Sequence, residues 1–154
     1  MRTDTATRVI AAPTRTVYRS LLNPVAVAEW RAPDGMRNSI EKFQVREGGE
    51  FRMALAYINQ DHRTPGKTTE HEDVVHGKFV KLVLNQLVIE EVEFETDDAD
   101  FKGTMRITTT LVPVPGGTRI TVACENVPEG VKAKDHQKGL ESSLANLAAF
   151  VERR

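Results

Sequence analysis

The sequence has little cysteine, few aromatic residues and almost no net charge, and these shortages exclude whole classes of protein. A single cysteine, Cys124, excludes an internal disulfide framework and a four-cysteine zinc site. The 21 basic and 22 acidic residues leave a net charge of -1, so the basic excess typical of nucleic-acid binding is missing. No apolar run approaches the roughly 20 residues that a membrane-spanning helix needs, and no signal peptide is recognisable. We therefore expect a cytoplasmic protein that binds no nucleic acid and inserts into no membrane.

What is present is the composition of an ordinary globular domain. The chain has 154 residues, of which 40% are hydrophobic and 28% charged. A chain of this length usually builds one hydrophobic core. Neither an internal repeat nor a low-complexity linker divides it. We therefore expect one domain, residues 1–154.

The spacing of apolar residues predicts the order of the elements. Residues 7–12 form a first strand that Pro13 ends, and two short helices follow over residues 14–22 and 25–30. From residue 37 the period changes to the alternation of strands, with turns at Gly48-Gly49 and Gly116-Gly117. Six strands are predicted, over residues 37–45, 51–57, 71–84, 87–95, 105–111 and 120–124, with polar segments at 59–69 and 96–102. The last segment is helical, because Leu140, Leu144, Leu147 and Val151 share one face.

Strands that follow one another through short turns pair as an antiparallel sheet. The apolar stripe of the last helix must cover one apolar face of that sheet. The predicted fold is therefore α+β: a curved antiparallel sheet of about seven strands around a long C-terminal helix, with two short helices between strands one and two.

Short pieces of the sequence occur in a characteristic order: Ile10–Pro13, Val17–Arg19, Asn23-Pro24, Ala28–Trp30, Pro33–Met36, Gly48–Met53, Gly77–Val80, Leu82-Val83, Gly116–Thr118, Gly139, Ser143-Leu144 and Leu147. In this order they resemble the helix-grip or START-like (SRPBCC) superfamily. Within it the chain is similar to the family named after the activator of the ninety-kilodalton heat-shock protein ATPase, in its bacterial branch. The family pattern often has an aromatic residue where Arg31 stands and a tryptophan where Leu140 stands, and both differences lower the aromatic content of the cavity that the resemblance implies.

A helix held by a curled sheet leaves room for a small molecule wherever the facing side chains are small. Trp30 is expected at the mouth of such a cavity, and Trp30 and Tyr57 each carry a polar group that needs a partner. The alternative is that the same side chains fill a solid core. The predicted apolar lining is Trp30, Phe51, Met53, Leu55, Tyr57, Val92, Phe94, Met105, Ile107, Leu140 and Leu144.

Two titratable residues are candidates for polar contacts in this cavity. Strand parity places Glu90 with Val92 and Phe94 on the core face, where a carboxylate must be paired, neutral or in contact with water. The alternative is a shifted register that leaves Glu90 in solvent. His136 falls on the inner stripe of the last helix, or else is a partly exposed histidine at the helix start. With Tyr57, these two residues form the predicted polar part of the site.

The remaining chemistry-bearing residues predict neither a metal nor another cofactor. His71 and His76 differ by five positions on a strand and point to opposite faces, so the His71–Asp73 segment does not complete a metal site with His76. Cys124 occupies an apolar strand position and reads as a buried structural thiol. No nucleophile-elbow or serine–histidine–aspartate pattern is present, and no catalytic residue is assigned.

Three functions remain open. The first is the binding of a small apolar or amphipathic molecule between the sheet and the last helix, without covalent chemistry. The second is a cyclase or isomerase in the same cavity, with Glu90 or His136 as its acid or base. The third, implied by the family name, is a chaperone-associated interaction protein, and a homodimer is a further open alternative.

Overall fold

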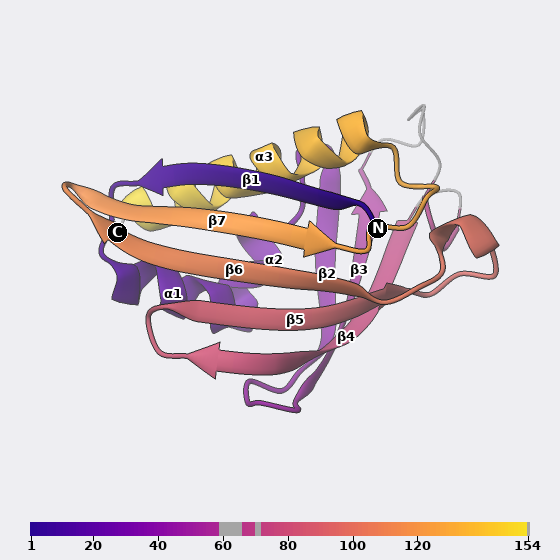
Figure 1. Ribbon diagram of the computed structural model, residues 1–154, viewed down its shortest axis with the longest axis horizontal. Coiled ribbons are helices and arrows are strands. Elements are labelled where there is room, and N and C mark those ends of the chain that lie inside the picture. Colours follow the sequence, from indigo (N-terminus) through magenta and orange to yellow (C-terminus); the bar gives the residue numbers. More distant parts are fainter. Residues whose placement is uncertain (59–65, 70–71, 154) are drawn as a thin grey trace.

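The computed structural model describes residues 1–58, 66–69 and 72–153. The predicted order of elements is confirmed there (Figure 1), whereas residues 59–65 of the predicted loop and His71 lie outside the described residues. A short 3₁₀ helix, Ala99–Phe101, interrupts the predicted acidic turn. The main elements are β1 (Thr3–Ile10), α1 (Thr14–Leu22), α2 (Pro24–Trp30), β2 (Met36–Phe43), β3 (Glu50–Tyr57), β4 (Glu72–Val83), β5 (Leu87–Phe94), β6 (Met105–Val114), β7 (Gly117–Glu125) and α3 (Ala133–Glu152).

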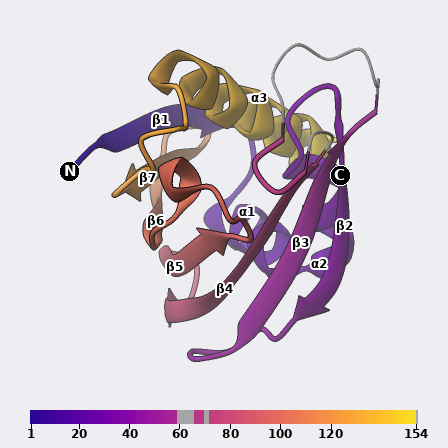
Figure 2. The ribbon, with the colours of Figure 1, turned by 90° about the vertical axis from the view of Figure 1, so that its right-hand side faces the viewer.

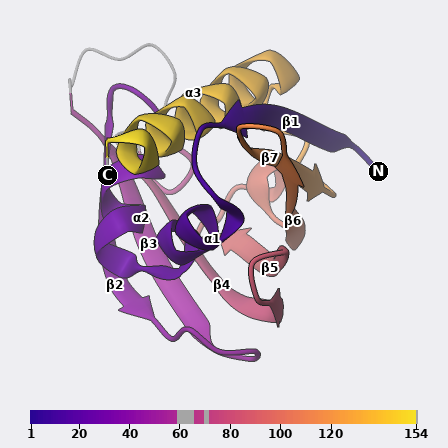
Figure 3. The same ribbon diagram turned by 90° about the vertical axis from the view of Figure 1, so that its left-hand side faces the viewer.

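The seven strands form one antiparallel sheet in the order β1-β7-β6-β5-β4-β3-β2. Register shifts occur in β2 between Ile40 and Lys42 and in β4 between Phe79 and Lys81. Such irregularities increase the local twist of a sheet. The sheet curls so that its edge strands β1 and β2 lie on either side of α3. The helices α1 and α2 also lie on the concave side of the sheet (Figures 2 and 3). The predicted helix-grip architecture is therefore confirmed.

The two short helices are fixed by local hydrogen bonds that the sequence encodes. The side chain of Asn23 accepts hydrogen bonds from the backbone N–H groups of Val25 and Ala26, and Pro24 takes the first helical position of α2. At the other end of α2, the indole N–H of Trp30 donates to the Ser20 carbonyl at 2.9 Å. The two helices thus form one unit under the sheet.

Several predicted strand boundaries are wrong, and β7, for example, begins at Gly117 rather than at residue 120. The first strand spans Thr3–Ile10 rather than residues 7–12, because its early residues pair with β7 and the backbone N–H of Ala12 bends back to Ile10. The edge-strand segment has only Asp4 and Ala6 facing inward, so it lacks the apolar alternation that marks a strand. The strand predicted over residues 105–111 continues to Val114 and includes Pro113, which pairs with Thr118.

The core lies between the second half of α3, the two short helices and the sheet. The buried residues of α3 are Leu144, Leu147, Ala148, Phe150 and Val151, all in its C-terminal half. In its first half, His136 and Leu140 are only half-buried. The helix is therefore fully packed at one end and more loosely covered at the other.

Candidate functional site

Four side chains lie in one row across the concave face of the sheet. Register pairs Glu90 of β5 with Ile107 of β6, Ile107 with Cys124 of β7, and Cys124 with Asp4 of β1. The two carboxylates in the row are buried, with Asp4 9% and Glu90 4% exposed. A buried carboxylate is costly unless it is paired, so the partners of Asp4 and Glu90 define the chemistry of this face.

Glu90 is paired with Arg31, which directly follows α2. The Arg31 guanidinium donates to the Glu90 carboxylate at 3.0 Å. The backbone carbonyl of Arg31 accepts a 2.8 Å hydrogen bond from the Ser143 hydroxyl of α3. Arg31 thus ties α2, α3 and the sheet together, and Glu90 lies on the core face that strand parity predicts.

Asp4 is paired with His136 at the start of α3. His136 Nδ1 lies 2.7 Å from the Asp4 carboxylate, and Arg2 donates to the same oxygen at 3.0 Å. Burial alone would raise the pKa of Asp4, but the hydrogen bonds from His136 and Arg2 outweigh it and hold that pKa below its usual value. His136 therefore lies on the inner stripe, as predicted, and fastens the start of α3 to β1.

Tyr57 stands at the opposite side of the concave face, at the end of β3. Burial raises the pKa of its phenol, and the carboxylates of Asp73 and Asp135 raise it further. The hydroxyl therefore keeps its proton over the physiological range. Asp73 is itself held by Lys67, whose ammonium group lies 2.9 Å from the carboxylate and 5.4 Å from the ring centre of Phe94.

The single thiol of the described chain lies in the middle of the row. Burial raises the pKa of Cys124 to about 12, and the Arg31 cation offsets only part of this effect. The thiol is 1% exposed, which agrees with the predicted structural role and argues against a nucleophile.

The predicted lining residues divide into two groups by burial. One group belongs to the core and the other remains half-buried on the concave face and on α3. The core group is Trp30, Phe51, Met53, Glu90, Val92, Met105 and Leu144. The half-buried group is Leu55, Tyr57, Phe94, Ile107, His136 and Leu140, and we call its members the inner face. Trp30 directs its indole N–H to Ser20, between α1 and α2.

Two pockets open elsewhere on the molecule. One, of about 650 Å³, lies beside α1, and the other, of about 530 Å³, lies between α2 and the C-terminal end of α3. Neither pocket is lined by a predicted site residue.

Among the described residues, no group of three or more histidine, cysteine or acidic side chains is arranged so that it could hold a metal ion. No described helix is long and apolar enough to cross a membrane.

Sequence reasoning missed two partners of the site. Arg31 stood out in the sequence only because it replaces an aromatic residue of the family pattern. The expected burial of Glu90 favours a cationic partner, and that preference was the signal that could have pointed to Arg31. Asp4 lies in the part of β1 that the apolar pattern does not mark. The 132-residue separation between Asp4 and His136 leaves no local trace of their contact.

A seven-stranded sheet gripping a C-terminal helix, with polar pairs at its concave face, defines a helix-grip domain of the START-like (SRPBCC) superfamily. The family model described as "Activator of Hsp90 ATPase homolog 1-like protein" matches residues 11–152. The chain belongs to this family.

Solved structures share the fold of this chain. A protein of Chromobacterium violaceum is 29% identical, with a TM-score of 0.86 and coverage of 97% of this chain and 96% of the other. A Rhodobacter sphaeroides protein is 19% identical, with a TM-score of 0.78 and coverage of 97% and 91%. An AHSA1-like protein of Aeromonas hydrophila is 15% identical, with a TM-score of 0.73 and coverage of 99% and 93%. No curated protein matches this chain.

Proposed function

We propose that the protein binds a small apolar or amphipathic molecule against the inner face, between the sheet and the first half of α3. The observation that carries this proposal is the burial pattern. Leu55, Phe94 and Ile107 point to the concave side of the sheet yet remain half-buried, and so does Leu140 above them. An apolar face that the protein's own side chains cover only in part gains free energy by contact with an apolar ligand.

The polar groups around the inner face favour an amphipathic ligand over a purely apolar one. Tyr57 keeps its hydroxyl proton, and the Arg31–Glu90 pair lies beside Ile107 in the same row of the sheet. A ligand with one hydroxyl or carbonyl group could therefore make a polar contact while its apolar part covers the inner face. Such a combination of apolar walls with a few polar groups is typical of small-molecule sites.

Binding without chemistry agrees better with these contacts than a cyclase or isomerase does. The Glu90 carboxylate is engaged by Arg31, and the His136 ring is engaged by Asp4. A general acid or base needs a proton position that the substrate can reach. Both candidate groups instead serve as internal partners that hold elements together.

The test is calorimetric titration with octanol, an uncharged amphiphile, of the wild-type protein and two tryptophan variants. Ile107→Trp fills the inner face, and Val112→Trp adds the same ring on the same strand at a position that is 44% exposed. We expect Val112→Trp to bind octanol like the wild type and Ile107→Trp to lose affinity by about tenfold or more. Equal octanol affinity in Ile107→Trp and in the wild type would overturn the proposal, provided that circular dichroism shows the variant to be folded.

A further inference from the structure

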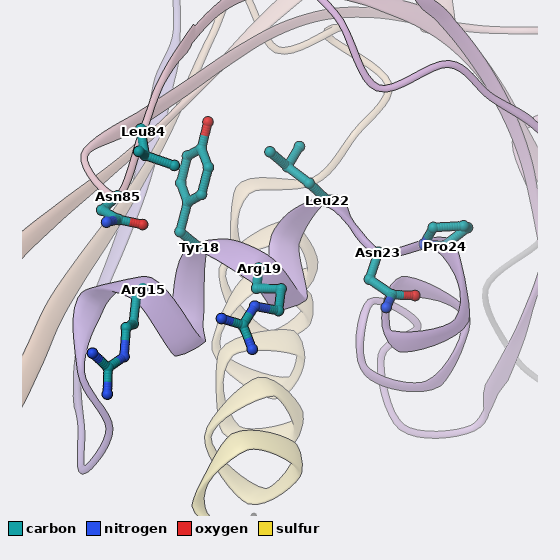
Figure 4. A pocket seen from close by; sticks show the side chains of 8 residues that line it. All are labelled: Arg15, Tyr18, Arg19, Leu22, Asn23, Pro24, Leu84 and Asn85. Atoms are coloured by element: carbon teal, nitrogen blue, oxygen red, sulfur yellow. The ribbon is translucent and has the colours of Figure 1, made fainter.

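The larger surface pocket, of about 650 Å³, lies outside the inner face. It opens between α1 and the turn that joins β4 to β5, and Figure 4 shows the side chains around it. Its lining shares no residue with the inner face, so it can hold a ligand independently of the proposed site. The lining consists of Arg15, Tyr18, Arg19, Leu22, Asn23, Pro24, Leu84 and Asn85.

Two arginines give this pocket its charge. Arg15 and Arg19 are four residues apart on α1, so they lie one helical turn apart on the same side. Both are exposed, and neither has a hydrogen bond or ion pair with any residue that the structure describes. By contrast, Arg52 and Arg106 are held by glutamates of the sheet. Two unengaged guanidinium groups at the rim of one pocket match the planar, bidentate contacts that carboxylates and phosphates accept.

The opposite wall of the pocket is apolar. Figure 4 shows the Tyr18 ring between Leu84 and Leu22, whereas the side chains of Arg15 and Arg19 extend from α1 away from these apolar groups. Leu84 is 72% exposed, an unusual state for so large an apolar side chain. A ligand body lying on Leu84 and Leu22 would remove that apolar surface from water, which favours binding.

The pocket is also polarised. The Tyr18 hydroxyl points away from the arginines in Figure 4. Burial raises the pKa of this phenol, and the nearby Glu47 carboxylate raises it further. Glu47 is fixed there, because its carboxylate accepts the backbone N–H of Leu82 at 3.0 Å. An anionic group is thus attracted to the arginine end and repelled from the Tyr18 hydroxyl end, which fixes the orientation of a bound amphiphile.

We propose that this pocket binds a small amphiphile whose carboxylate or phosphate lies between Arg15 and Arg19 and whose apolar part lies against Leu22 and Leu84. The head group and the apolar part make separate contributions, so both are needed for full affinity. The site is a second binding site, and it does not depend on the ligand proposed for the inner face.

The test is an NMR titration of the full chain in which backbone amide signals report the site. Octyl phosphate and octanoate carry both parts, inorganic phosphate carries the head alone, and octanol carries the chain alone. We expect octyl phosphate and octanoate to shift the amide signals of Arg19, Leu84 and Asn85 with saturation. Inorganic phosphate and octanol should affect these signals with at least about tenfold weaker affinity.

Paired variants show whether the arginines act as a site or only through net charge. Arg15→Gln with Arg19→Gln should weaken octyl phosphate binding by about tenfold or more, because the charged head group loses both of its charge-assisted contacts. Arg8→Gln with Arg119→Gln removes the same charge from exposed positions on β1 and β7 and should leave the affinity unchanged. Leu84→Ala should weaken octyl phosphate and leave inorganic phosphate unchanged.

Three results would overturn the proposal: unchanged affinity in the Arg15/Arg19 variant, an equal loss in the Arg8/Arg119 variant, or octanol binding at Leu84 as tightly as octyl phosphate. Vesicles of phosphatidylglycerol distinguish the source of the anion. If the vesicles broaden the amide signals of the wild-type protein but not those of the Arg15/Arg19 variant, the anionic head group belongs to a membrane lipid. If the vesicles leave the wild-type signals unchanged, the head group belongs to a free molecule. The inner face is tested with the Ile107→Trp variant, whereas this pocket is tested with the amide signals of Leu84 and Asn85. Either proposal can therefore fail while the other holds.

Discussion

At the residue scale, the Arg31–Glu90 pair is the contact on which the concave face depends most. Glu90 is 5% and Arg31 is 21% exposed in side-chain surface, so both charges have left most of their water. Such a pair contributes little compared with an apolar pair of similar volume, yet loss of one member leaves the other uncompensated. The pair therefore constrains which substitutions the site tolerates.

The first prediction concerns Glu90→Gln, which leaves the Arg31 cation without a counter-charge. We expect the free energy of unfolding, measured by urea denaturation, to fall by about 3 kcal/mol. Glu29→Gln, which removes the carboxylate of the exposed Arg153–Glu29 pair, serves as the control and should cause no measurable change. Replacing both members, as Arg31→Leu with Glu90→Leu, should recover most of the loss. A loss for Glu90→Gln as small as that of the control would contradict the prediction.

The second prediction concerns the pH dependence of stability through Asp4. Its pKa in the folded protein lies below the unfolded value of about 3.9, because His136 and Arg2 hold the charged form. The resulting stabilisation is fully present above that unfolded value and is lost as the pH falls through the lower pKa of the folded state. Asp4→Asn should therefore lower the urea midpoint at neutral pH, and its difference from the wild type should narrow toward about pH 3.

The control for Asp4 is Asp97→Asn, a change at an exposed aspartate in the turn after β5. Its stability difference from the wild type should be small at every pH. If the Asp4→Asn difference were the same at neutral and at acid pH, the contacts with His136 and Arg2 would not hold the charged carboxylate.

At the scale of elements, glycines show where β4 and α3 meet their neighbours. A Cβ atom at Gly77 would lie 2.3 Å from the Glu91 carbonyl oxygen and 2.9 Å from Phe51. The Phe51 ring therefore passes directly over β4, and it also packs against Phe79 with ring centres 5.1 Å apart. At Gly139 of α3, a Cβ atom would meet only Pro33 at 3.7 Å, an ordinary contact.

The third prediction is that the same substitution has opposite effects at these two glycines. Gly77→Ala should lower the free energy of unfolding by about 1–3 kcal/mol, because the core must shift to admit the methyl group. Gly139→Ala should raise it by up to about 1 kcal/mol, because alanine favours the helix. Thermal and urea unfolding of both variants provide the measurement. A stabilised Gly77→Ala variant would show that β4 and Phe51 are not in close contact.

The elements themselves were predictable wherever a regular apolar period marked them. The period of Thr14–Leu22 and the alternation of Phe51–Tyr57 gave both elements almost to the residue. The start of β1 was not predictable in this way, because it is an edge strand stabilised by pairing with β7, which a local pattern does not contain. The end of β6 was not predictable for a related reason, because residues 112–114 are held by pairing with β7 across the turn.

At the scale of the whole molecule, the fold followed from the order of elements and the single apolar stripe of α3. The pairing partners of Glu90 and His136 did not follow, because ion pairs between distant segments depend on the final curvature of the sheet. The pocket beside α1 was likewise missed, since it forms only where α1 meets the β4–β5 turn. The order of the elements can thus be predicted from the sequence, whereas the polar contacts between distant segments become visible only in the folded structure.

The proposed binding of a small molecule on the inner face, between the sheet and the first half of α3, can be tested most directly by intermolecular NMR contacts between octanol and the methyl groups of the protein. We expect contacts from the octanol chain to the methyl groups of Leu55, Ile107 and Leu140. Contacts confined to exposed side chains such as Val9 and Val25, with none to these three, would contradict it.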